Sequence, residues 1–292
     1  MTSFGTAWPL NIAISEAPII DSRQSVDHDG GVKVLIALIF AVYGLVIGSF
    51  LNVVIDRVPK RESVVRPRSR CPQCDAAISS RDNIPLLSWL LLHGRCRSCG
   101  LPISVHYPLV EAGTAIVFGV TAAHFGAGWN LAIYLVLFVG LIPLAVIDGY
   151  QRLLPIRVLY PVLATTIALL LADTLDHHDW RRLLVAAACG AVWFGAYFVL
   201  NLLRPDALGF GDVRLVGLLG LSVGWLGVSV VFIAFFASNL LGIVCALVML
   251  ALQKAHRDTP IPYGVFLALG AGVAVLVGPS IVSHIPILQG HR

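Results

Sequence analysis

Four of the six cysteines form two CxxC pairs within one polar segment. The first pair is Cys71 and Cys74, the second is Cys96 and Cys99, and 21 residues separate the pairs. A CxxC turn places two thiolates on one side of a tight loop, so two such turns can complete a tetrahedral site of four sulfurs. This spacing is typical of a zinc site. Because no position is left for water or substrate, the predicted zinc is structural.

Two disulfides or a redox dithiol are the alternatives for these cysteines. Disulfides are rare where the cytoplasm keeps thiols reduced, and a redox motif needs only one CxxC. The pattern therefore favours zinc. The remaining cysteines, Cys189 and Cys245, lie in apolar runs and are predicted to be small packing residues.

Two carboxylates stand at the ends of long apolar runs. Asp148 occurs in LAVIDGYQRLLP and Asp212 in LGFGDVRL. An ionisable residue in a membrane span is costly and is a functional hypothesis by default. Two carboxylates within reach of each other cannot both ionise cheaply, so one stays protonated while the other can activate water. If the fold brings these two together, they are candidates for the acid and base of an aspartic protease mechanism.

A simpler interpretation is that Asp212 caps the following helix while Asp148 faces interfacial water. Capping explains only one of the two acids, so the sequence favours catalysis. Glu111, one turn into a predicted span, either reaches the membrane interface or serves the site.

The composition requires a membrane. Of 292 residues, 58% are hydrophobic and 12% charged, and the mean hydropathy is +0.86, which excludes an ordinary soluble domain. Several apolar runs approach the roughly 20 residues that a span needs. We therefore predict an all-α integral membrane protein with about eight transmembrane helices and a zinc-binding cytoplasmic insertion. The predicted spans are residues 33–54, 107–126, 130–148, 154–174, 182–203, 213–226, 228–252 and 262–285.

The distribution of positive charge orients these spans. Nine of the 20 Lys and Arg residues lie between Arg57 and Arg97, and short basic loops stay on the cytoplasmic side. With the N-terminus outside, 15 of the 20 fall on the inner side. This orientation, derived without the acids, places Asp148 and Asp212 at one level on the cytoplasmic face. The predicted inner segments are residues 55–106, 149–153, 204–212 and 253–261.

Other functional classes fit less well. A proton- or cation-coupled transporter also uses intramembrane Asp residues, but relay acids line a path near the midplane, whereas these two lie at one face. A scaffold that docks a partner through its zinc loop remains a further alternative. Nucleic-acid binding is disfavoured because the basic segment lacks interleaved aromatic residues. The acidic and histidine-containing loop 173–180 is predicted to be a solvated turn, not a metal site.

Taken together, the motifs resemble those of the type IV prepilin leader peptidases, the bifunctional prepilin peptidase and N-methyltransferase family. The likeness runs from about residue 45 to about residue 275. It rests on GSFLNVVIDRVP, the two CxxC pairs around NIPLLSWLLLHGRC, PISVHYPLVE, IDGYQRLLP, GFGDVRL and IPYGVFLALGAG, in this order.

The resemblance implies an aspartic endopeptidase of the inner membrane. Such an enzyme removes the leader of type IV prepilins and type II secretion pseudopilins on the cytoplasmic side. It then methylates the new N-terminus with S-adenosylmethionine. By motif match the catalytic residues are Asp148 and Asp212, and the zinc ligands are Cys71, Cys74, Cys96 and Cys99. No binding residue for S-adenosylmethionine follows from the motifs.

Four parts are therefore predicted. Residues 1–32 form an acidic, outward-facing tail, and residues 33–54 form the first transmembrane helix. Residues 55–106 form the cytoplasmic four-cysteine zinc loop. Residues 107–285 form the multi-span aspartic peptidase domain, and the expected partners are pilin-like substrates and the lipid bilayer.

Overall fold

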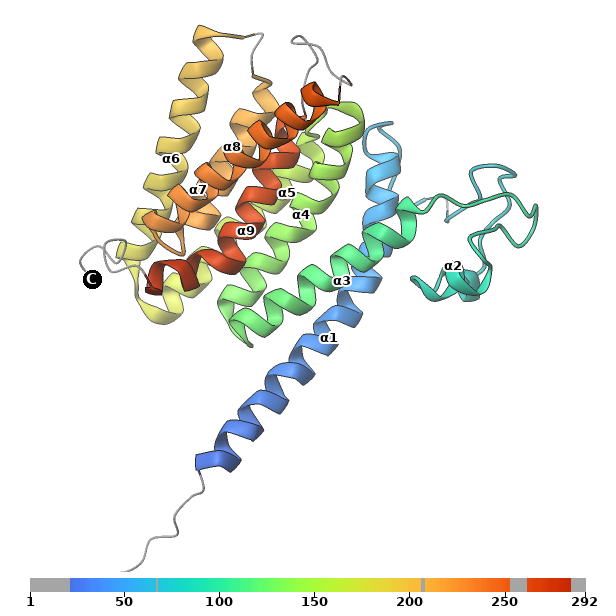
Figure 1. Ribbon diagram of the computed structural model, residues 1–292, viewed down its shortest axis with the longest axis horizontal. Helices are drawn as coiled ribbons and strands as arrows, with labels where there is room; N and C mark the ends of the chain where they lie inside the picture. Colours follow the sequence, from blue (N-terminus) through green and yellow to red (C-terminus); the bar gives the residue numbers. More distant parts are fainter. Residues whose placement is uncertain (1–21, 67, 206–207, 253–261, 285–292) are drawn as a thin grey trace, which may run out of the picture.

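The computed structural model describes residues 22–66, 68–205, 208–252 and 262–284, and within these ranges the fold is helical, with two isolated β-bridges and no strand (Figure 1). The predicted segment 253–261 and most of the predicted tail lie outside these residues. The helices are α1 (Ser22–Arg57), the short 3₁₀ helix η1 (Ser80–Asn83), α2 (Leu87–Leu91), α3 (His106–Phe125), α4 (Trp129–Gln151), α5 (Ile156–His177), α6 (Trp180–Leu203), α7 (Phe210–Gly224), α8 (Val228–Ala251) and α9 (Tyr263–His284).

Seven of the described helices are long and apolar enough to cross a membrane: α1 from Gly30, then α3, α4, α5, α6, α8 and α9. The prediction of an all-α membrane protein is confirmed. The sixth predicted span, residues 213–226, corresponds to α7, whose 15 residues are shorter than the roughly 20 needed to cross the hydrocarbon layer. Helix α1 begins at Ser22, so residues 22–32 of the predicted tail are helical.

Helices α1 and α3 form a close pair through glycines. A β-carbon at Gly44 would lie 2.7 Å from the Cα atom of Ala115, and one at Gly48 would lie 2.8 Å from the Cα atom of Glu111. Small residues four positions apart let the two backbones touch, as is common between membrane helices. The pair therefore holds both ends of the intervening loop, residues 58–105, in fixed positions beside the bundle.

Helix α7 lies in the middle of the remaining bundle, and most of its residues are buried. A β-carbon at Gly220 would lie 2.8 Å from the carbonyl oxygen of Cys189, and one at Gly224 would lie 2.7 Å from the Cβ atom of Cys189. Cys189 thus packs α6 against α7, as predicted. The close approach of α6 thus helps to keep most of this short helix buried.

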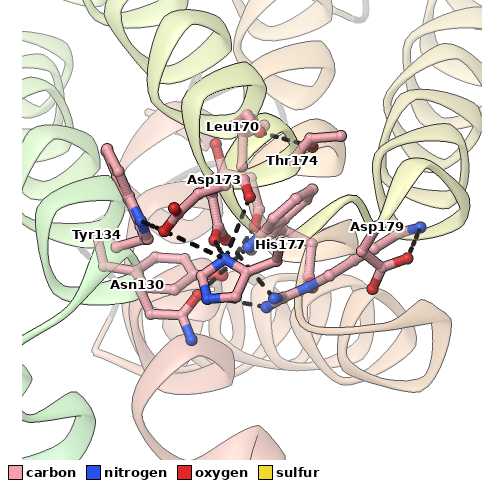
Figure 2. Close-up of polar contacts among 12 residues, drawn as sticks. Asn130, Tyr134, Leu170, Asp173, Thr174, His177 and Asp179 are labelled. Carbon is pink, nitrogen blue, oxygen red and sulfur yellow. Dashed lines mark hydrogen bonds and ion pairs between the residues drawn. The ribbon is translucent and has the colours of Figure 1, made fainter.

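A polar network ties the helix ends opposite Asp148 and Asp212 (Figure 2). Asp173, buried near the end of α5, pairs with His177 and lies 3.7 Å from the guanidinium of Arg182. Arg182 also donates to the carbonyl of Trp225 at 2.8 Å and lies over its ring. The described part of the predicted turn 173–180 gathers no metal-ligand cluster. Asp173 and Arg182 together link α5, α6 and the α7–α8 turn.

Replacing Arg182 tests this network. Arg182→Ala leaves Asp173 with His177 alone and removes the donor to Trp225, so we expect the free energy of unfolding to fall by about 2 kcal/mol. That corresponds to a denaturation midpoint lowered by roughly 4 °C or more in detergent. The neighbouring Arg181 is exposed, and Arg181→Ala serves as the control. Equal midpoints for the two variants would contradict the assignment.

Candidate active site and metal centre

Asp148 lies in the last turn of α4 and is 5% exposed. Helix α4 ends directly after it, because Arg152 takes a left-handed conformation and its N–H closes on the carbonyl of Asp148. The carboxylate accepts a hydrogen bond from the backbone N–H of Val265 at 3.1 Å. This donor belongs to the first turn of α9, where helix N–H groups have no partner within the helix. Asp148 therefore supplies an acceptor that this helix end needs.

Asp212 lies in the first turn of α7, which begins at Phe210 after the N-cap Gly209. The helix starts three residues earlier than predicted, so Asp212 is not its N-cap residue and stands within its first turn. Its Oδ2 atom faces Gly209, whereas its Oδ1 atom is buried without a hydrogen-bond partner among the described residues. Buried polar atoms are almost always paired in native structures, so Oδ1 is available for water or substrate. The capping interpretation leaves this second oxygen unexplained.

The two aspartates lie on either side of the segment that joins α4 to α5. Leu154 of this segment adjoins Gly211, the neighbour of Asp212, and Gly264, which lies beside the carboxylate of Asp148. The side chain of Leu154 fills the space beside them: a β-carbon at Gly211 would lie 2.9 Å from its Cβ atom, and one at Gly264 would lie 3.2 Å from its Cδ1 atom. Glycine is thus required at both positions for α7 and α9 to approach Leu154.

Hydrogen bonds between side chains of α6, α8 and α9 support the site. The hydroxyl of Tyr263, the first residue of α9, lies 2.8 Å from that of Tyr197 on α6 and donates to Asn239 of α8 at 3.1 Å. Asn201 donates to the carbonyl of Leu208 at 2.7 Å, just before Gly209. These bonds fix the starts of α9 and α7. They therefore also hold the N–H of Val265 in position beside Asp148. The periodicity of the sequence indicates none of these hydrogen bonds. Its only signal here is the polar interruption between two apolar runs just before IPYG.

The two CxxC pairs fold into matching turns. In each, the N–H of the first cysteine, Cys71 or Cys96, donates to the carbonyl five residues later at 2.9 Å. The residue four positions on, Asp75 or Gly100, has a left-handed backbone and donates back to that cysteine's carbonyl. An isolated antiparallel bridge closes each turn. The two CxxC turns thus have the same backbone geometry, and each can contribute two sulfurs to one four-sulfur site.

The four predicted ligand sulfurs lie together. The Sγ atoms of Cys71, Cys74, Cys96 and Cys99 are all within 4.8 Å of one another. The backbone N–H groups of Cys99 and Ser98 lower the pKa of the Cys96 thiol to about 6, which favours the thiolate that binds metal. No disulfide joins these four cysteines in the structure. The cluster can hold a zinc ion.

A cavity of about 180 Å³ lies between this loop and the ends of α1 and α3, not between the aspartates. Its wall includes Asn52 and Asp56 of α1, Glu111 of α3, and Trp89 of the loop. Glu111 is buried, and its Oε2 atom accepts the N–H of Leu86 at 2.8 Å. Glu111 therefore joins the span to the loop instead of reaching the interface. Sequence reasoning had left its role open and had not identified Asn52.

Two family models match the chain. The bacterial Peptidase A24 N-terminal domain matches residues 42–125, which include all four clustered cysteines, and the type IV leader peptidase family matches residues 135–247, which include both aspartates.

Curated relatives share most of the chain. A protein of Myxococcus xanthus is 43% identical over 77% of this chain and 67% of its own length. One of Stutzerimonas stutzeri is 36% identical over 83% and 91%, and one of Bacillus subtilis is 32% identical over 85% and 97%. All three are named prepilin leader peptidase/N-methyltransferase. No solved structure matches the chain.

Proposed function

The chain belongs to the type IV leader peptidase family, and we propose that it is a membrane-embedded aspartic endopeptidase for prepilins and pseudopilins that also methylates the N-terminus it exposes. The peptidase half is supported by the placement of Asp148 and Asp212 on either side of Leu154, with an unpaired buried oxygen on Asp212 and a backbone donor on Asp148.

In the proposed mechanism, the two aspartates share a water molecule. The deprotonated carboxylate removes a proton from this water, which attacks the scissile carbonyl, while the protonated one donates a hydrogen bond to the carbonyl oxygen. The pair then returns a proton to the leaving amine. Because the two groups titrate together, acid and base are properties of the pair and not of one residue. The first turn of α9 keeps Asp148 oriented throughout.

The substrate geometry follows from the position of the pair at one end of the bundle. A prepilin with a basic leader in the cytoplasm and an apolar helix in the bilayer presents its scissile bond at this level. We propose the inner-membrane orientation that the basic residues indicate, with the N-terminus outside. Residues 55–106 and the active site within residues 107–285 then face the cytoplasm.

Purified full-length protein tests the proposal directly. Incubation in detergent with a prepilin and S-adenosylmethionine is expected to yield a leader-free, N-methylated product, detected by mass spectrometry. The transporter alternative predicts instead that liposomes containing the protein take up protons or cations, with no cleavage. An intact prepilin after prolonged incubation with a folded sample would overturn the proposal.

The four-cysteine cluster is proposed to bind one structural zinc. Cys71→Ser removes a ligand, so the zinc content measured by elemental analysis should fall from about one ion per chain toward none. Residues 68–105 should then exchange amide hydrogens faster, because the two turns are no longer joined. Cys245→Ser, in α8, is the control and should retain zinc. Full zinc occupancy in the Cys71 variant would contradict this site.

We propose the cavity beside the loop as the site of the methyl donor. S-adenosylmethionine supplies an electrophilic methyl group on a sulfonium cation. Asp56 and Glu111 offer negative charge, and Trp89 offers an aromatic ring, a combination that suits such a cation. Val58 and Pro59, which follow the residues lining this cavity, line a second depression that reaches Leu154. The new amine would thus have a short path from the aspartates.

Glu111→Gln tests this assignment without removing the acceptor for Leu86. We expect affinity for S-adenosylmethionine, measured by calorimetry on the full-length protein, to fall at least roughly tenfold, the size of a lost charge interaction. Leader cleavage should persist. Unchanged affinity would place the donor elsewhere, whereas lost cleavage with unchanged affinity would show that Glu111 serves the peptidase.

A further inference from the structure

The four-cysteine loop exposes a run of large apolar side chains. Within the stretch IPLLSWLLL, residues 84–92, the exposed fractions are 47% for Ile84, 48% for Leu87, 62% for Leu90 and 68% for Leu91. Ser88 is buried in the same stretch, and Trp89 donates from its indole N–H to the carbonyl of Ile103 at 3.2 Å. The leucines therefore point outward because other residues fill the interior. Contiguous exposed apolar side chains mark an interaction surface.

The position of this stretch relative to the membrane spans indicates that it contacts the membrane surface. Leu86, directly before α2, donates its N–H to Glu111, which lies five residues inside the span α3. At a rise of 1.5 Å per residue, the Cα atom of Glu111 lies about 7.5 Å along α3 from its start, so the bond to its side chain holds the start of α2 beside the first turns of the span. In Figure 1 the loop runs out from the end of α1 and turns back, so that α2 lies near the start of α3. Amphipathic segments that lie in a membrane surface bury their apolar side to about 5–10 Å.

The return of the chain is enforced locally. Leu86 has φ +59° and ψ −50°, a strained three-residue turn in which the N–H of Leu87 donates to the carbonyl of Pro85 at 2.6 Å. The hydrogen bond from the N–H of Leu86 to the buried Glu111 stabilises this conformation. On the other side of α2, Trp89 packs against Gly94. The leucines are therefore held at this depth by the tertiary structure.

The charges around the leucines complement anionic lipid. Residues 55–106 contain nine Lys and Arg residues against four Asp and Glu. Arg81 and Arg95 flank the leucines, are exposed, and form no salt bridge within the described part of the chain. Basic side chains beside an interfacial apolar segment attract anionic headgroups by about 1 kcal/mol each.

We propose that residues 84–92 are an interfacial anchor, with Leu87, Leu90 and Leu91 inserted among the lipids beside the bundle and Arg81 and Arg95 on anionic headgroups. The anchor holds the four-cysteine loop against the membrane, at the end of the bundle where Asp148 and Asp212 lie. The inference does not depend on the reaction catalysed.

Photocrosslinking from the full-length protein in lipid nanodiscs tests the anchor. A benzophenone side chain is introduced as Leu91→p-benzoylphenylalanine, and as Val65→p-benzoylphenylalanine for the control. Val65 is 78% exposed on the same loop but outside the leucine run. We expect phospholipid adducts from position 91 in several-fold excess over position 65. Retained zinc would establish that each labelled loop is folded.

Lipid composition separates the two parts of the proposal. Nanodiscs that contain phosphatidylglycerol should give more adduct at position 91 than phosphatidylcholine alone, and Arg81→Gln with Arg95→Gln should abolish this difference. Equal lipid labelling at positions 91 and 65 would overturn the anchor, as would adducts to protein alone, which would instead indicate a docking surface. A difference that survives the arginine changes would overturn the headgroup contacts.

Discussion

Asp148→Asn and Asp212→Asn, each made alone, are expected to lower prepilin cleavage by roughly 10³-fold, the scale on which a general acid or base contributes. An amide cannot accept a proton from water or return one to the leaving amine. With only one aspartate intact, the pair therefore cannot supply both an acid and a base. The effect should appear in kcat, because the substrate is held mainly by contacts with its leader and its apolar helix. Single-turnover cleavage in detergent, followed by mass spectrometry, measures it.

Asp75→Asn is the matched control for these variants. Asp75 is exposed on the four-cysteine loop and pairs with Arg70 at 2.9 Å, a surface interaction of small energetic value. Cleavage by this variant should match that of the unmodified chain. Both active-site variants should retain their denaturation midpoint and zinc content, which separates lost chemistry from lost folding. A normal cleavage rate in either would exclude the proposed pair.

Gly264→Val is expected to lower cleavage by at least about 10²-fold, the cost of misplacing a catalytic group by roughly 1 Å. A β-carbon at this position would lie 2.9 Å from the Oδ2 atom of Asp148, nearer than such atoms approach without displacement. The carboxylate must then move away from the N–H of Val265, and its geometry relative to Asp212 changes. Gly264→Ala should give a smaller loss in the same assay.

Gly195→Val controls for the insertion of a branched residue into a span. No atom lies within 4 Å of the position that a β-carbon at Gly195 would occupy, so the change is accommodated without movement. Cleavage should remain normal. If Gly264→Val also cleaves normally, the contact between the first turn of α9 and Asp148 is unimportant for the reaction.

Much of the site could be predicted because its signals are local. The two CxxC pairs predict a metal site by spacing alone, and the structure brings all four sulfurs together. Hydropathy and length identify the spans, since the bilayer requires long apolar runs whatever their neighbours are. Counting Lys and Arg residues places Asp148 and Asp212 at one level, because each ends or begins a span on the same side.

The predictions from local sequence were wrong where packing against a neighbouring helix determines the structure. Helix α7 has the composition of a span but not the length, and it remains in the core because α6 approaches Gly220 and Gly224 closely. The acidic turn near Asp173 looked solvated, but Asp173 is buried because Arg182 and His177 reach it.

The sequence by itself determined which residues are candidates for chemistry in this protein, and the distribution of its basic residues predicts their membrane level. Only the tertiary structure decided how they are held: the N–H of Val265 on Asp148, Leu154 between two glycines, and Glu111 drawing the loop back toward the spans. These contacts join residues distant in the chain, and a single sequence carries no periodicity that encodes them. Residue type and hydropathy are local properties, whereas orientation at the site depends on which helices pack together.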